Sequence, residues 1–202
     1  MENYTENNVP SREQIALYPQ FISLDPKQIL VIKTLEQCQA IQTELENIAI
    51  FGFDTESKPT FRKGEINTGP HLIQLASEHK AYLFQVNSET LTFLSKLLSN
   101  RQQLKVGFGL KNDLHLFRKK NIELQGIFDL AKSFKSFGIN NAVGIKNAIA
   151  VLFQQNFPKN KRISTSNWSK SHLSPEQISY AAADAYAALL VFLELERLGC
   201  IK

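Results

Sequence analysis

An apolar run at residues 49–53 stops abruptly at Asp54, Thr55 and Glu56. A short apolar run of this kind predicts a buried strand. Side chains alternate between the two faces of a strand, so Asp54 and Glu56 should point the same way, about 7 Å apart along the backbone. Two neighbouring carboxylates repel each other unless a cation joins them, so the pair suggests a site for Mg²⁺ or Mn²⁺. For this pair alone, an acidic strand end in solvent is the alternative.

The composition is that of a packed and mildly basic chain. Of the 202 residues, 43% are hydrophobic and 21% charged, and the formal net charge is +4. That balance permits a polyanionic partner without requiring one. Cys38 and Cys200 lie far apart in the sequence, so they indicate neither a zinc cluster nor a disulfide framework. The amino-terminal residues are polar, and Asp184, Glu194 and Glu196 interrupt the longest apolar stretch; we therefore expect no membrane span and a cytoplasmic location.

Periodicity predicts an α/β domain preceded by a flexible segment. Residues 1–20 are rich in polar residues and lack periodicity, so we expect a flexible lead-in followed by one domain over residues 21–202. Besides the strand that ends at Glu56, strands are predicted at residues 29–32, 72–76, 81–86 and 104–110, and helices at residues 35–47, 90–98, 114–120, 127–137, 143–153 and 175–198. The polar residues 77–80 predict a hairpin, whereas the later alternation of strand and helix favours parallel pairing.

Two more acidic residues stand at informative positions. Asp113 lies where the strand at residues 104–110 turns into its helix, a place where open α/β sheets hold their sites, although a helix cap explains this residue better when it is judged alone. Asp184 lies in the last helix, one turn after Tyr180 and among several alanines. The alanines should let this helix lie close to the sheet, so Asp184 is expected near the core rather than in solvent.

Basic and aromatic residues give weaker signals. Lys58 begins a basic loop beside the carboxylates, which could contact phosphate or simply be solvated. Trp168, with Lys170 nearby, could stack on a base or anchor the packing of the connection. The sequence Gly107-Phe108-Gly109 does not complete a dinucleotide-binding fingerprint, because Asn112 occupies the third glycine position.

In combination, the acidic signals resemble a known family. Phe53-Asp54-Thr55-Glu56, then Gly107-Phe108-Gly109-Leu110-Lys111-Asn112-Asp113, then Tyr180-Ala181-Ala182-Ala183-Asp184 resemble the three motifs of the DEDDy 3′→5′ exonucleases. The resemblance spans residues 29–198 and is strongest to the Werner-syndrome-type exonuclease domain, with ribonuclease D more distant. Residues 166–170 also resemble the segment before the third motif in the Werner-type branch. Ser179 stands where the related DEDDh group has histidine, which supports the tyrosine variant.

This resemblance implies a ribonuclease H-like (DnaQ-like) fold, with a mixed five- to six-stranded sheet flanked by helices. It implies hydrolysis of DNA or RNA from a 3′ end, releasing nucleoside 5′-monophosphates, with DNA favoured and no protein partner identified. Two divalent cations about 3.5–4 Å apart could hold the attacking and leaving oxygens. Asp54 would bridge them, Glu56 and Asp184 would complete the first site and Asp113 the second.

Further roles complete the prediction. Tyr180, whose ordinary pKa is about 10, would orient the attacking water rather than take its proton. Substrate contacts are predicted for Thr55, Lys58, Asn112, Trp168 and Lys170. Two alternatives stay open: a ribonuclease D-like exoribonuclease, and a catalytically weak nucleic-acid-binding module of the same fold.

Overall fold

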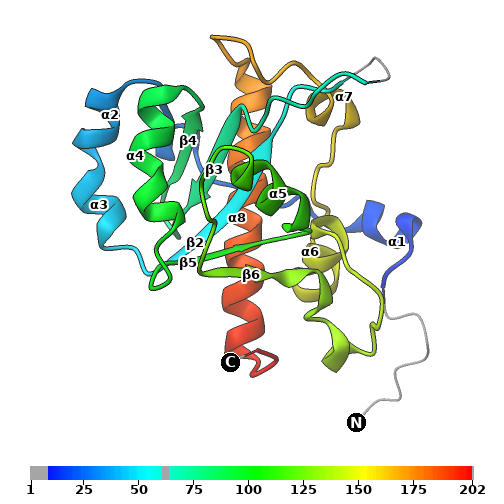
Figure 1. The fold of residues 1–202 in the computed structure, drawn as a ribbon. Helices are drawn as coiled ribbons and strands as arrows, with labels where there is room; N and C mark the ends of the chain where they lie inside the picture. Colours follow the sequence, from blue (N-terminus) through cyan, green and yellow to red (C-terminus); the bar gives the residue numbers. More distant parts are fainter. Residues whose placement is uncertain (1–8, 61–63, 202) are drawn as a thin grey trace.

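The chain is represented by a computed structural model that describes residues 9–60 and 64–201. Its centre is a six-stranded mixed sheet in the order β1-β4-β3-β2-β5-β6 (Figure 1). The strands are β1 (Ile29–Ile32), β2 (Ile50–Glu56), β3 (Leu72–Ala76), β4 (Ala81–Gln85), β5 (Leu104–Gly107) and β6 (Ile127–Asp129). The predicted mixed sheet flanked by helices is therefore confirmed.

Strand pairing places β2 at the junction of the antiparallel and parallel parts of the sheet. β2 runs antiparallel to β3, where Asp54 lies opposite Gln74, and β3 continues as a hairpin into β4. On its other side β2 pairs in parallel with β5, which pairs in parallel with β6. The predicted hairpin and the predicted change to parallel pairing are both confirmed.

Helices cover both faces of the sheet (Figure 1). One face packs against α2 (Leu35–Ala40), α3 (Gln42–Glu46), α4 (Ser88–Leu98) and α5 (Lys111–Arg118). The other packs against α6 (Ile145–Phe153), α7 (Lys161–Ser164) and α8 (Pro175–Arg197). Phe51 and Phe53 are buried on the first side. Alternation along β2 therefore directs Gly52, Asp54 and Glu56 toward α8.

Helix α8 begins and ends as its sequence predicts. The Ser174 hydroxyl accepts a hydrogen bond from the Gln177 N–H, and the Gln177 side-chain oxygen accepts one from the Ser174 N–H. After the last turn, Gly199 has a φ of 68°, which favours glycine.

The expectation that no segment could span a membrane does not hold for length and composition, because by these two criteria α8 is long and apolar enough to do so. However, 67% of its apolar window is buried inside this protein, as in a core helix.

The predicted helix at residues 127–137 is wrong. Residues 127–129 form β6, and two short 3₁₀ helices follow, Leu130–Lys132 and Lys135–Phe137. Asp129 explains the change, because its carboxylate accepts hydrogen bonds from the N–H groups of Gly109 and Leu110 at 3.0 Å each. This contact ties the segment to the end of β5, a long-range interaction that amphipathic periodicity does not report.

Two other segments differ locally from their predictions. The helix predicted at residues 35–47 is split into α2 and α3, because Ile41 leaves helical geometry at φ −112° and ψ 3°. Both halves still place an apolar side chain, Cys38 and Leu45, in the core. The lead-in contains a helix that periodicity did not reveal, α1 (Arg12–Leu17), started by a Ser11 capping box and holding Ile15 buried. Residues 1–8 of the predicted lead-in lie outside the described residues.

Candidate active site

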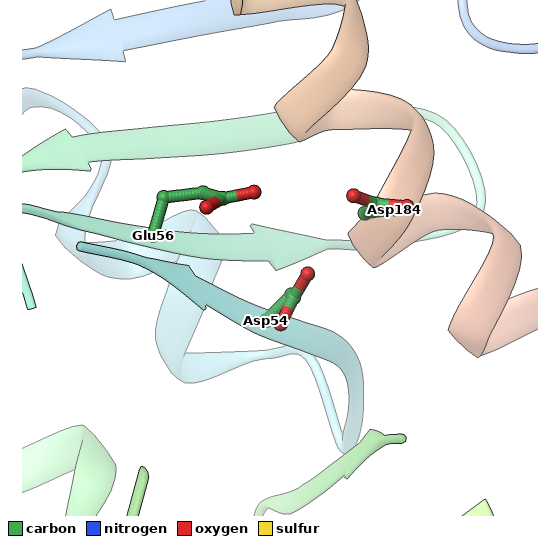
Figure 2. Close-up of side chains that lie close together, drawn as sticks. All are labelled: Asp54, Glu56 and Asp184. Carbon is green, nitrogen blue, oxygen red and sulfur yellow. The ribbon is translucent and has the colours of Figure 1, made fainter. Parts of the chain in front are cut away.

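Three carboxylates from two elements meet on the α8 side of the sheet. Asp54 and Glu56 extend from β2 and Asp184 from α8, and each offers an oxygen within 4.8 Å of the others. Figure 2 shows the Glu56 side chain reaching toward Asp184, with Asp54 extending from the strand toward the same space. The predicted meeting of these three acids is thus present in the structure.

Gly52 allows this close approach. A Cβ atom at position 52 would lie 1.9 Å from the carbonyl oxygen of Ala185, the residue after Asp184. Only glycine lets the backbone of α8 lie this near β2. Ala185 is fully buried at this contact, and Ala181 and Ala182 are fully buried among residues of β3 and β4, so small residues bring α8 and Asp184 close to the sheet.

Burial raises the pKa of all three acids, and repulsion by neighbouring carboxylates adds to the effect at Asp54 and Glu56. Burial raises the pKa of Asp54 well above its ordinary value, and the negative charges of Asp184 and Asp113 raise it further. Burial and the Asp54 charge raise the pKa of Glu56 to about 9, and burial raises that of Asp184 to about 6. Oxygen ligands whose ionised forms are this poorly compensated fit a hard divalent cation, which would favour their ionised forms.

These shifts predict how the stability of the cation-free protein depends on pH. The folded protein retains protons on Glu56 and Asp184 that the unfolded chain has already released. The free energy of unfolding in EDTA should therefore fall from about pH 5 to about pH 9, by on the order of a few kcal/mol. Urea unfolding across this range measures the slope. Glu56→Gln should flatten it, and equal slopes for the variant and the wild type would exclude this cause.

The three acids open into a cavity of about 540 Å³ that also contains Tyr180 and Lys159. The Lys159 charge lowers the pKa of all three acids, opposing the effect of burial. Sequence analysis missed this lysine as a site residue, because it lies in the irregular connection before α7. The basic composition of this connection was visible in the sequence, but no spacing pattern linked Lys159 to the three acids.

The Tyr180 phenol stays neutral at ordinary pH. Burial raises its pKa above the ordinary value, and the charges of Asp184 and Glu56 add to the effect. A phenol in this state is a poor base but can still donate or accept a hydrogen bond. Tyr180 packs against Trp168, with ring centroids 6.2 Å apart.

Asp113 is close to the cluster but is held differently. It lies in the first turn of α5, where its carboxylate accepts a hydrogen bond from the Thr55 hydroxyl. Its charge raises the pKa of both Asp54 and Glu56, so it is electrostatically part of the site. It does not belong to the described group of three carboxylates within 4.8 Å. Its predicted contact with a second cation stays a prediction.

The predicted substrate contacts lie outside the described cavity lining. For Trp168, the structure supports the packing alternative over base stacking, because this side chain is 0% exposed and its ring N–H donates to the Ser164 carbonyl at 3.1 Å. The Thr55 hydroxyl is engaged with Asp113. Lys58 forms an ion pair with Glu65 at 3.6 Å, and Asn112 and Lys170 are exposed. Substrate contacts by these four residues stay predictions.

Known proteins are similar to this chain in sequence and in fold. The mouse (Mus musculus) bifunctional 3′-5′ exonuclease/ATP-dependent helicase WRN is 30% identical over 169 residues, which cover 79% of this chain and 12% of the mouse protein. The Aedes aegypti Nibbler EXO domain has a TM-score of 0.74 at 22% identity, covering 87% of this chain and 90% of that domain. The Trypanosoma brucei RNase D complex with RNA U12 has a TM-score of 0.72 at 20% identity, covering 94% and 66%.

These similarities agree with the geometry of the site. The structural similarities show that the mixed sheet has the ribonuclease H-like exonuclease fold. At 22% and 20% sequence identity, they show the fold alone. The family described as 3′-5′ exonuclease matches residues 29–199, which include all three carboxylates, Asp113 and Tyr180. The chain therefore belongs to the 3′-5′ exonuclease family.

Proposed function

We propose that this chain is a metal-dependent 3′→5′ exonuclease that releases nucleoside 5′-monophosphates and uses two divalent cations, Mg²⁺ or Mn²⁺. The observation that carries the proposal is the convergence of Asp54, Glu56 and Asp184 within 4.8 Å at the wall of a cavity. Because the chain spans 12% of the mouse relative, the activity of that whole protein is not transferred to it.

Each side chain of the site has a separate role in the proposed hydrolysis. Asp54, Glu56 and Asp184 would hold one cation, and Asp54 with Asp113 the other. When bound, the cations supply positive charge that stabilises the attacking and leaving oxygens of an in-line displacement. Tyr180 would orient the attacking water by a hydrogen bond, and Lys159, in the lining of the same cavity, would contact a phosphate oxygen.

We infer DNA as the favoured substrate. Residues 166–170 resemble the segment before the third motif of the Werner-type branch, and the mouse relative is 30% identical over 169 residues. The burial of Trp168 assigns this segment a packing role, so the inference rests on sequence similarity rather than on a base contact. The RNA in the trypanosomal complex makes RNA the alternative substrate.

Digestion of matched 5′-labelled DNA and RNA strands tests this function. With Mn²⁺ or Mg²⁺, we expect a ladder that shortens from the 3′ end, with DNA consumed faster and no shortening in EDTA. Faster loss of RNA would identify the ribonuclease D-like alternative. Binding of both strands without any metal-dependent shortening would identify a binding module and contradict the proposal.

Tyr180→Phe should lower kcat with little change in KM. The variant keeps the ring that packs on Trp168 and removes only the hydroxyl that would orient the water. A loss of about 10²-fold is expected for a positioned hydroxyl group. Steady-state digestion kinetics measure it, with the urea unfolding curve as the control for folding. Unchanged kcat would remove the hydroxyl from the proposed mechanism.

Lys159→Met should act mainly on KM. The side chain is exposed and lies in a connection, so its loss should not affect the core. Removing a charge-assisted contact to phosphate should raise KM about tenfold, which corresponds to about 1.4 kcal/mol. The salt dependence of binding to a catalytically inactive background should also become shallower. Wild-type KM and salt dependence would show that Lys159 does not contact the substrate.

A further inference from the structure

Gln74, in the middle of β3, carries an amide that is buried and has no partner among the described residues. The residue is 0% exposed, and within the described residues neither Oε1 nor Nε2 has a hydrogen-bond partner. An amide buried in this way loses its bonds to water and gains none from the protein, which opposes folding. A native structure that retains such a group usually uses it.

The position of Gln74 connects it to the acidic cluster. Gln74 lies directly opposite Asp54 in the antiparallel pair of β2 and β3. Residues opposite each other in such a pair have Cβ atoms about 4.5–5.5 Å apart on the same face of the sheet. Leu72 and Ala76, two residues before and after Gln74, pack on the α8 side with Ala182. The Gln74 side chain is therefore buried on the face of the sheet that α8 covers, the same face from which Asp54 extends.

Two other buried glutamines differ from Gln74. Gln103 donates from Nε2 to the carbonyl oxygens of Leu45 at 2.8 Å and Ile48 at 2.9 Å. Gln177 donates to the Ser166 hydroxyl at 2.8 Å and caps the start of α8. Both glutamines have a structural task that is complete in the cation-free protein. Gln74 has no such task.

We propose that Gln74 is a positioning residue for Asp54, donating a hydrogen bond from Nε2 to the Asp54 carboxylate when that carboxylate binds a divalent cation. The inference rests on the proposed function and adds a residue that the acidic motifs do not contain. An uncharged donor suits this place. A lysine or arginine would neutralise the carboxylate and repel the cation, whereas an apolar side chain would leave its orientation free. Partners of this kind, behind a metal ligand, strengthen metal binding.

Gln74→Leu separates this role from a structural one. Leucine fills similar space and removes the unpaired amide, so the variant should be as stable as the wild type, or more stable, in EDTA. Its affinity for Mn²⁺, measured by calorimetry on the full chain, should fall at least about tenfold. The concentration of Mn²⁺ needed for half-maximal digestion should rise by the same factor.

Gln103→Leu is the matched control, because it makes the same chemical change at a buried glutamine whose amide is paired. It should destabilise the protein in EDTA, since two carbonyl oxygens lose their donor. The affinity of the folded variant for Mn²⁺ should equal that of the wild type. The two variants should therefore show opposite patterns.

Two results would overturn the inference about Gln74. One is wild-type affinity for Mn²⁺ in Gln74→Leu. The other is a loss of stability in EDTA as large as that of Gln103→Leu, which would show that Gln74 serves the cation-free fold. Both results leave the proposed function standing if the wild type binds Mn²⁺ and digests the strand. If the wild type binds no Mn²⁺, the proposed function and this inference fail together.

Discussion

Replacing Gly52 with alanine should both destabilise the protein and disable its acidic cluster. The added Cβ would lie 1.9 Å from the Ala185 carbonyl oxygen and 2.9 Å from its carbon. Both are backbone atoms of α8, so no flexible side chain can move aside, and the helix must shift. Overpacking of this kind costs about 3 kcal/mol or more. A shift of about 1 Å in Asp184 relative to Asp54 would also lower activity about 10²-fold.

The measurement for Gly52→Ala is the free energy of unfolding in urea, with digestion of the labelled strand as the second readout. Gly144→Ala is the stability control, because a Cβ at that position meets no atom within 4 Å and the backbone there needs no positive φ. The control should cost no more than about 1 kcal/mol, because Gly144 is the N-cap of α6, where alanine is less favourable than glycine. If Gly52→Ala and Gly144→Ala change the free energy of unfolding equally, the close contact between β2 and α8 does not determine how these two elements are positioned.

Asp54→Asn should abolish digestion while making the cation-free protein more stable. Asparagine keeps the shape of the side chain but cannot ionise, so folding no longer has to protonate a carboxylate whose pKa is raised by burial and by the charges of Asp184 and Asp113. Loss of a shared cation ligand should lower the rate at least about 10³-fold, equivalent to about 4 kcal/mol. In EDTA at pH 8, the free energy of unfolding should rise by about 1–3 kcal/mol.

The opposite signs of these two effects make the Asp54 variant informative. A residue needed only for folding would lose activity and stability together. Glu196→Gln is the control, because it removes an exposed acid from the same helix that carries Asp184. It should leave both readouts unchanged. An Asp54→Asn protein that is less stable in EDTA than the wild type would show that electrostatic strain is not the dominant property of the cluster.

Local patterns predicted the parts of the site that depend on one element at a time. Alternation along β2 placed Asp54 and Glu56 on one face, and helical spacing placed Asp184 one turn after Tyr180. The Ser174 capping box and Gly199 fixed the ends of α8, because both signals lie within a few residues of the helix end. The resemblance to known motifs then supplied what spacing could not, the meeting of these distant residues.

Features set by contacts between distant segments were not predictable in the same way. β6 forms because Asp129 joins the end of β5, and periodicity made the same residues look helical. The basic neighbours of Trp168 left base stacking and packing both open, and its full burial beside Tyr180 shows that it is a packing residue. Lys159 lies in the cavity lining because of the path of an irregular connection, and Gln74 lies opposite Asp54 because β3 pairs with β2. Neither contact can be predicted from the residues next to it in the sequence.

The most direct measurement is the anomalous scattering of manganese in crystals grown with Mn²⁺ and a nucleoside 5′-monophosphate. We expect manganese in contact with carboxylate oxygens of Asp54, Glu56 and Asp184, and a second manganese that Asp54 shares with Asp113. Crystals at saturating Mn²⁺ in which no manganese contacts Asp54 or Asp184 would contradict the assignment of this cluster as the catalytic centre.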